Sequence, residues 1–167
     1  MTKKIVDVFH NKKIRVPFFV PDISQSDKLA VMNALNSRML TDGPQLRKFE
    51  RKFAKYTGSK YAVGVSNGTA ALHLALKALG LKKGDEVIIP NITFVATANS
   101  VLLTGATPVL VDVNYDDMNI SLDSIKQNIT SKTKAILPVH IAGKICKMTQ
   151  IKKIAKKNNL LLIEDCA

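Results

Sequence analysis

Residues 66–74 read SNGTAALHL, and this stretch decides the class of fold. It follows an apolar segment at 61–65 and opens a run rich in alanine and leucine. This order predicts a strand, a short polar turn at Gly68-Thr69 and then a helix. The first turn of a helix has free N–H groups and a dipole that favours an anion. The turn could therefore hold a phosphate, or it could be an ordinary strand-to-helix connection.

The rest of the chain alternates between strand and helix patterns. Strands are predicted at 61–66, 86–90, 107–113, 134–140 and 160–165, and helices at 68–79, 93–103, 122–129 and 148–157. Strands separated by helices of this length are typical of βαβ units. We therefore expect a three-layer α/β fold in which helices flank a mostly parallel sheet. Ser121 is expected to cap the helix at 122–129.

The first 60 residues have a different pattern. Residues 17–21 indicate extended chain, and Ser24 is placed to cap a helix that carries Leu29, Met32 and Leu35. Gly43-Pro44 then begins a second helix, with Leu46, Phe49 and Phe53 on one face. We expect an N-terminal arm with two helices at 1–60 and the first part of a sheet-bearing domain at 61–167.

Composition narrows the class of protein. The chain has 167 residues, of which 46% are hydrophobic, and this favours a globular fold over disorder. The 25 basic and 13 acidic residues give a net charge of +12, but the lysines are scattered and no motif reads RNA or DNA. We expect no nucleic-acid partner, no membrane span, no metal site and no secretory signal. Cys146 and Cys166 are expected to be free thiols in the cytoplasm.

Several candidate ligand contacts follow the predicted strands. In an open α/β sheet, ligands bind beyond the carboxyl ends of the strands. Asp165 follows a buried apolar run, so its charge would cost free energy unless a cation, such as a protonated pyridine nitrogen, or hydrogen bonds offset it. Phe94 could stack on a flat ring or belong to the core, and His140 could contact a ligand or simply end a strand. Neither a G-x-G-x-x-G nor a P-loop sequence is present.

The order of these segments is more specific than any one of them. The chain resembles the DegT/DnrJ/StrS-type sugar aminotransferases, which are fold-type I pyridoxal phosphate enzymes. The resemblance runs from about residue 16 to residue 167. It is carried by LTDGP at 40–44, SNGTAALHLAL at 66–76, GDEVIIP at 84–90, TFVATAN at 93–99, GATPV at 105–109, PVH at 138–140 and IED at 163–165.

The resemblance implies a cofactor site. The fold would be the incomplete large domain of a pyridoxal phosphate-dependent transferase. Gly68 and Thr69 would bind the cofactor phosphate, and Phe94 would stack on the pyridine ring. Asp165 would pair with the ring nitrogen and keep it protonated. Further candidates for lining the site or contacting substrate are Thr41, Asn91, Thr93 and His140.

The resemblance also implies an activity. Members act on nucleotide-linked keto sugars, take the amino group from glutamate, serve amino-sugar biosynthesis and work as homodimers. Their Schiff-base lysine and small C-terminal domain lie beyond the position of residue 167, so no catalytic residue is assigned here. We expect the N-terminal part of such an aminotransferase, inactive alone, with either a homodimer or a complementing C-terminal chain as its partner. The alternatives are a non-catalytic remnant or binding module, and a dehydratase relative that uses histidine in place of the lysine.

Overall fold

The computed structural model describes residues 20–167, and the chain divides between residues 64 and 65 into two compact units. Most of the extended segment expected at 17–21, and the start of the family resemblance near residue 16, lie outside the described residues. No helix in the described part is long and apolar enough to cross a bilayer.

The first unit contains the two expected helices, α1 (Gln25–Leu35) and α2 (Pro44–Thr57). Ser24 caps α1: its hydroxyl accepts the Asp27 N–H at 3.2 Å, and the Asp27 carboxylate accepts the Ser24 N–H at 2.8 Å. The Ser24 hydroxyl also donates to the Asp27 carboxylate at 2.7 Å, and this bond, with the one from the Ser24 N–H, lowers the pKa of Asp27. Gly43 and Pro44 begin α2, as the sequence predicts. The second helix ends at Gly58, whose φ of 71° is the left-handed conformation that glycine favours.

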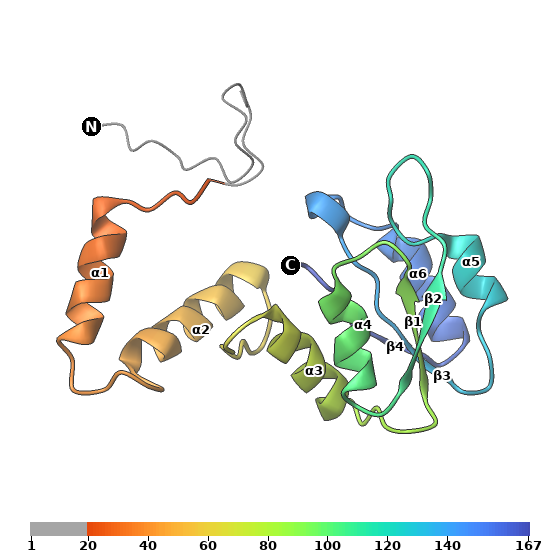
Figure 1. The fold of residues 1–167 in the computed structure, drawn as a ribbon, viewed down its shortest axis with the longest axis horizontal. Helices are drawn as coiled ribbons and strands as arrows, with labels where there is room; N and C mark the ends of the chain where they lie inside the picture. Colours follow the sequence, from red (N-terminus) through yellow and green to blue (C-terminus); the bar gives the residue numbers. More distant parts are fainter. Residues whose placement is uncertain (1–19) are drawn as a thin grey trace. The chain divides into compact units, whose positions relative to one another are not determined.

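The second unit is built on a four-stranded parallel sheet with the order β2-β1-β3-β4 (Figure 1). Its strands are β1 (Glu86–Pro90), β2 (Thr107–Val111), β3 (Thr133–Ile136) and β4 (Leu161–Leu162). Its helical segments are α3 (Gly68–Ala78), α4 (Val95–Leu102), α5 (Leu122–Gln127), the 3-10 turn η1 (Ile141–Gly143) and α6 (Met148–Lys157). Ser121 caps α5 as expected, because its side chain accepts the Ser124 N–H.

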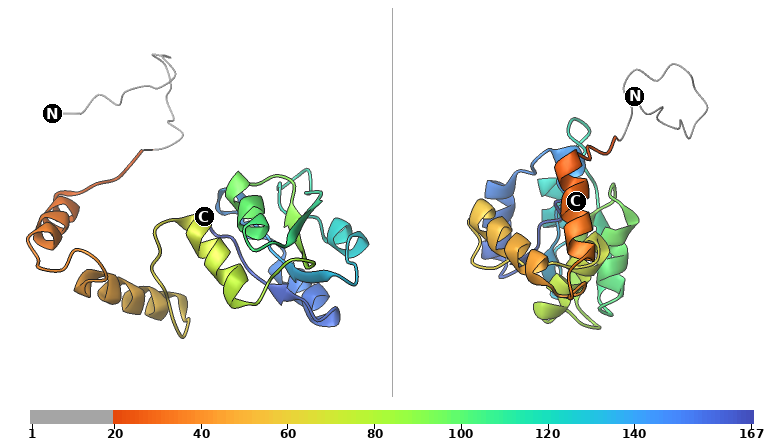
Figure 2. Two further views of the ribbon diagram at one scale, coloured as in Figure 1. Left: turned by 60° about the horizontal axis from the view of Figure 1, so that its bottom comes forward. Right: turned by 90° about the vertical axis from the view of Figure 1, so that its left-hand side faces the viewer.

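Helices cover both faces of this sheet (Figures 1 and 2). Alternate residues of β1 point to opposite sides, so Val87 and Ile89 join one core and Ile88 joins the other. The first core contains Leu76 of α3 and Val101 of α4, and the second contains residues of α5 and α6. The predicted three-layer α/β architecture is therefore confirmed.

The strand predicted at 61–66 is absent. Its Tyr61 and Val63 side chains are 73% and 77% exposed, and no described strand pairs with the segment. A β-strand exists only where a neighbouring strand completes its hydrogen bonds, and the apolar pattern alone does not supply that neighbour.

Three predicted strands are longer than the observed ones. The expected strand at 107–113 ends at Val111, because the Asp112 N–H turns to the Ser124 hydroxyl and Val113 bridges to Ile120 instead. The expected strands at 134–140 and 160–165 shorten to β3 and β4, since Pro138 has no N–H to donate. Pairing resumes beyond Pro138 as a bridge between Val139 and Asp165.

Candidate functional site

A cavity of about 400 Å³ lies in the second unit, beyond the carboxyl ends of the parallel strands. This is where the topology of an open α/β sheet places ligands. Residues from the start of α3, the start of α4, and the segments after β3 and β4 surround it. They are Asn67, Gly68, Thr69, Leu72, Thr93, Phe94, Ala96, Val139, Ile141, Asp165 and Ala167.

The N-terminus of α3 presents free hydrogen-bond donors to the cavity. The Asn67 side chain accepts the Ala70 N–H at 2.9 Å, and the Asn67 carbonyl accepts the Ala71 N–H at 3.1 Å. This leaves the N–H groups of Gly68 and Thr69 without an acceptor among the described residues. Two free amides, the adjacent Thr69 hydroxyl and the helix dipole make this end of the cavity suited to an anion.

Asp165 provides a negative charge at another wall of the cavity. Asp165 is only 6% exposed, and no cationic side chain of the described residues forms an ion pair with it. One carboxylate oxygen accepts the Thr97 hydroxyl at 2.8 Å, and the other accepts the Ala167 N–H at 3.2 Å. These bonds offset part of the cost of burying the charge and leave a cavity-lining carboxylate that a cation would complement.

A short chain of hydroxyls leads to this carboxylate. The Thr93 and Thr97 hydroxyl oxygens lie 2.8 Å apart, and Thr97 is fully buried. Because the carboxylate can only accept, the Thr97 hydroxyl donates to Asp165 and accepts the hydroxyl proton of Thr93. Sequence analysis did not identify Thr97. Helical spacing gave no signal, because Thr93 precedes the N-cap of α4 and Thr97 lies inside the helix.

Phe94 lies at the N-cap position of α4 and is 77% exposed. It lines the cavity and does not belong to either hydrophobic core, which removes the alternative that it is a packing residue. An exposed aromatic ring beside a cavity can cover one face of a flat ligand.

The structure brings Gly68, Thr69, Thr93, Phe94 and Asp165 to one cavity. Their individual roles toward a cofactor stay predictions. Two other candidates are outside the lining: Asn91 donates its side-chain N–H to Asp112 at 3.2 Å, and His140 is described below. Thr41 belongs to the first unit, and its role stays a prediction.

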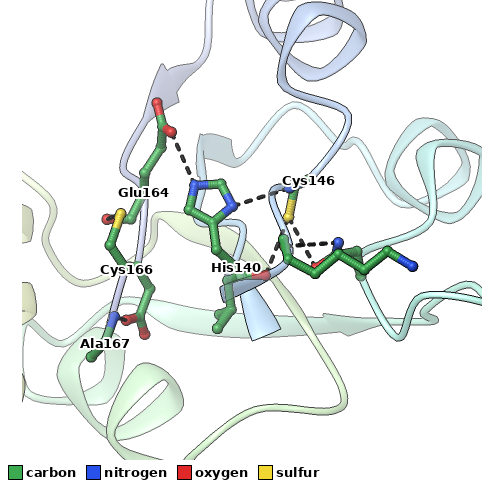
Figure 3. Close-up of polar contacts among 9 residues, drawn as sticks. His140, Cys146, Glu164, Cys166 and Ala167 are labelled. Atoms are coloured by element: carbon green, nitrogen blue, oxygen red, sulfur yellow. Dashed lines mark hydrogen bonds and ion pairs between the residues drawn. The ribbon is translucent and has the colours of Figure 1, made fainter. Parts of the chain in front are cut away.

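Both ring nitrogens of His140 are engaged by the protein (Figure 3). Nδ1 accepts the Cys146 N–H at 3.1 Å, so in the neutral ring the proton is on Nε2, which lies 3.1 Å from a Glu164 carboxylate oxygen. The histidine thus ties the segment after β3 to the segment after β4, and its neighbours Val139 and Ile141 reach the cavity. Within the described structure this favours a strand-end role over direct ligand contact.

Neither cysteine has the lowered thiol pKa of a reactive nucleophile. Burial raises the pKa of the Cys146 thiol, which donates to the Val139 carbonyl at 3.2 Å. Burial also raises the pKa of Cys166, and the charges of Glu164 and Asp165 add to that shift. Among the described residues, no three histidine, cysteine or acidic side chains gather in a way that could hold a metal ion.

The proteins that resemble this chain in sequence and structure include aminotransferases. GDP-perosamine synthase of Escherichia coli O157:H7 is 46% identical over 153 residues, which cover 91% of this chain and 42% of that protein. An aminotransferase structure from Psychrobacter cryohalolentis matches with a TM-score of 0.86 and 45% identity, covering 90% of this chain and 39% of that one. A structure of GDP-4-keto-6-deoxymannose-3-dehydratase with a trapped PLP-glutamate geminal diamine matches with a TM-score of 0.84 and 34% identity, covering 90% and 40%.

The chain therefore spans about two fifths of the length of these relatives. The family model for the DegT/DnrJ/EryC1/StrS aminotransferases matches residues 21–167. That match covers most of the chain, and it includes every residue that lines the cavity. The chain belongs to the DegT/DnrJ/EryC1/StrS aminotransferase family.

Proposed function

We propose that the cavity binds pyridoxal 5'-phosphate or its amino form, pyridoxamine phosphate, and that the chain is the N-terminal part of an enzyme that aminates a sugar. One observation carries the proposal: the buried Asp165 carboxylate, without a cationic partner in the described residues, shares a cavity with the free N–H groups of α3. A flat molecule with a phosphate at one end and a protonated ring nitrogen at the other complements both features. The volume of about 400 Å³ lies within the range of small-molecule sites.

Each residue has a distinct task in this proposal. Gly68 and Thr69 bind the phosphate through two backbone N–H groups and one hydroxyl. Phe94 covers one face of the ring, and Asp165 accepts the ring N–H and holds its proton there. When bound, the cofactor supplies an electron sink for charge that develops at the amine-bearing carbon. The protein residues orient the ring and maintain its charge.

We further propose the substrates of the complete protein. The similarity to a GDP-perosamine synthase supports a nucleotide-linked keto sugar as acceptor, with glutamate as the amino donor. Two free cysteines suit the reducing conditions of the cytoplasm. A homodimer, or a complementing C-terminal chain, would complete the site.

Transamination needs an amine that attaches the cofactor and moves a proton between carbon atoms. No lysine lines the cavity within residues 20–167. We therefore propose that the described residues hold the cofactor without attaching it and that the amine comes from elsewhere. This chain alone is expected to be catalytically inactive.

Calorimetric titration of the full chain with pyridoxamine phosphate tests the proposal, because this compound needs no covalent attachment. We expect saturable binding to one site per chain. Asp165→Asn should weaken it at least tenfold, because the ring cation loses a charged partner. Asp112→Asn, which alters a carboxylate outside the cavity, should leave it unchanged. Equal affinity in wild type and the Asp165 variant would refute the site.

Covalent attachment is measured separately. After incubation with pyridoxal phosphate and reduction by borohydride, intact-mass and peptide analysis should find no single lysine labelled stoichiometrically. A uniquely labelled lysine within residues 20–167 would contradict the expectation that the chain lacks the attachment site.

Two alternatives make different predictions. The similarity to a dehydratase at 34% identity supports a cofactor-dependent dehydration by the complete protein. Incubation of that protein with a nucleotide keto sugar and glutamate would then yield a deoxy sugar in place of an amino sugar. A non-catalytic binding module would bind pyridoxamine phosphate and catalyse neither reaction, even with a complementing chain.

A further inference from the structure

Thr97 is fully buried, and its hydroxyl does not line the cavity. It lies in the first turn of α4, 68 positions before Asp165 in the chain, yet its Oγ1 is 2.8 Å from a carboxylate oxygen of Asp165. Neither packing nor helix propensity favours threonine at this buried position. A buried hydroxyl must find a hydrogen-bond partner to offset its desolvation. The partner it finds is the one buried carboxylate of the candidate site.

We propose that Thr97 is a positioning residue that holds the Asp165 carboxylate in the orientation needed to face a cationic ring nitrogen. This inference rests on the proposed function, since it concerns the same cavity. A hydroxyl that donates to a carboxylate stabilises the ionised form and restricts rotation of the group. Thr97 is not among the residues that line the cavity, so in this proposal it acts only through the carboxylate.

Two further contacts support this hydrogen bond. The Thr93 hydroxyl lies 2.8 Å from that of Thr97 and supplies the proton that Thr97 accepts. On the other side, the Ala167 N–H lies 3.2 Å from the second carboxylate oxygen. Asp165 is thus held at both oxygens by donors of the protein, one from α4 and one from its own segment. Each oxygen retains lone-pair capacity for one more donor, which is what a ring N–H requires.

A matched pair of substitutions separates the hydroxyl from the shape of the side chain. Thr97→Val keeps the branched shape and removes the donor, whereas Thr97→Ser keeps the donor and removes a methyl group. Thr104→Val is the control: Thr104 is also buried in the α4 region, but its hydroxyl bonds to the Val101 carbonyl and does not reach the cavity.

The experiment compares two ligands on the full chain by calorimetry: pyridoxamine phosphate and its 1-deaza analogue, in which carbon replaces the ring nitrogen. For wild type, the affinity ratio of the two ligands reports the interaction of Asp165 with the ring cation. We expect Thr97→Val to reduce this ratio about tenfold or more, while Thr97→Ser and Thr104→Val keep it within about threefold of wild type. Because the ratio is taken within one variant, general loss of stability cancels.

A double-mutant cycle between Thr97 and Asp165 provides a second test with pyridoxamine phosphate alone. In an Asp165→Asn background, Thr97→Val should have little further effect on pyridoxamine phosphate affinity, because the hydroxyl acts only through the carboxylate. An unchanged ligand ratio in Thr97→Val, or full additivity with Asp165→Asn, would overturn the role of Thr97 while leaving the cofactor site intact. Absence of any pyridoxamine phosphate binding in wild type would refute the site itself and, with it, this role.

Discussion

Replacing Asp165 by asparagine should separate ligand binding from stability. The residue is 6% exposed, and its charge has two hydrogen-bond donors but no cation within the described residues. Burying a carboxylate costs several kcal/mol, and each hydrogen bond to a charged group returns about 1.5–3 kcal/mol. The two bonds therefore offset the cost only in part when no ligand is bound.

Asparagine keeps the shape and removes the charge. Its side-chain oxygen can accept from Ala167, and its NH₂ can donate to the Thr97 hydroxyl once that hydroxyl reverses. We expect the ligand-free variant to be as stable as wild type or about 1 kcal/mol more stable, which corresponds to a rise in Tm of about 3 °C for a chain of this size. The same variant should lose pyridoxamine phosphate binding at least tenfold.

Thermal unfolding followed by circular dichroism, without ligand and at neutral pH, measures the first quantity. Asp112→Asn provides the control, because that carboxylate is exposed and its replacement should stay within about 0.5 kcal/mol of wild type. If Asp165→Asn destabilised the ligand-free protein by 2 kcal/mol or more, the native charge would already be compensated by the protein. The inference that this carboxylate complements a cationic ligand would then be wrong.

Three further outcomes are expected. Asn67→Asp retains an N-cap acceptor for α3 and so should leave Tm unchanged. Its added negative charge should weaken pyridoxamine phosphate binding about tenfold in calorimetry. Binding of phosphate-free pyridoxamine should stay unaltered. Asn67→Ala should lower stability by about 1 kcal/mol in denaturant titration, whereas an unchanged midpoint would contradict the capping role. Iodoacetamide at pH 8 should alkylate Cys166 before Cys146. Burial raises the pKa of both thiols, so the difference in rate comes from exposure, and only Cys166 is exposed. Equal alkylation rates measured by mass spectrometry would argue against the buried position of Cys146.

The sequence predicted the layers of the fold because periodicity is a local property. The run Glu86–Pro90 has the length and apolar content of a buried parallel strand, and the pattern at 148–157 matches the helix Met148–Lys157 residue for residue. The location of the cavity followed for the same reason: once the strands are known, their carboxyl ends are known. The sequence therefore predicts that Gly68, Phe94 and Asp165 lie together, and all three line the cavity.

Features that depend on distant partners could not be predicted in this way. The apolar alternation at 61–66 is genuine, but a strand also needs a neighbour, and none of the described strands pairs with it. Thr97 was missed because its importance comes from a contact across 68 positions of sequence. For His140 the sequence leaves a ligand contact and a strand-end role open, and only the structure shows that Glu164 and the Cys146 N–H engage its two ring nitrogens.

We expect holding the cofactor and reacting with it to be separable in this fold, because the groups proposed for the first task come from one continuous part of the chain. The donors at Gly68 and Thr69, the ring at Phe94 and the carboxylate at Asp165 all belong to the unit at 65–167. Each is held by a feature of this unit: a capped helix start, an N-cap position, and a strand end supported by Thr97. No lysine of the described residues lines the cavity, so we expect the affinity for pyridoxamine phosphate to depend on these features and not on an attaching amine.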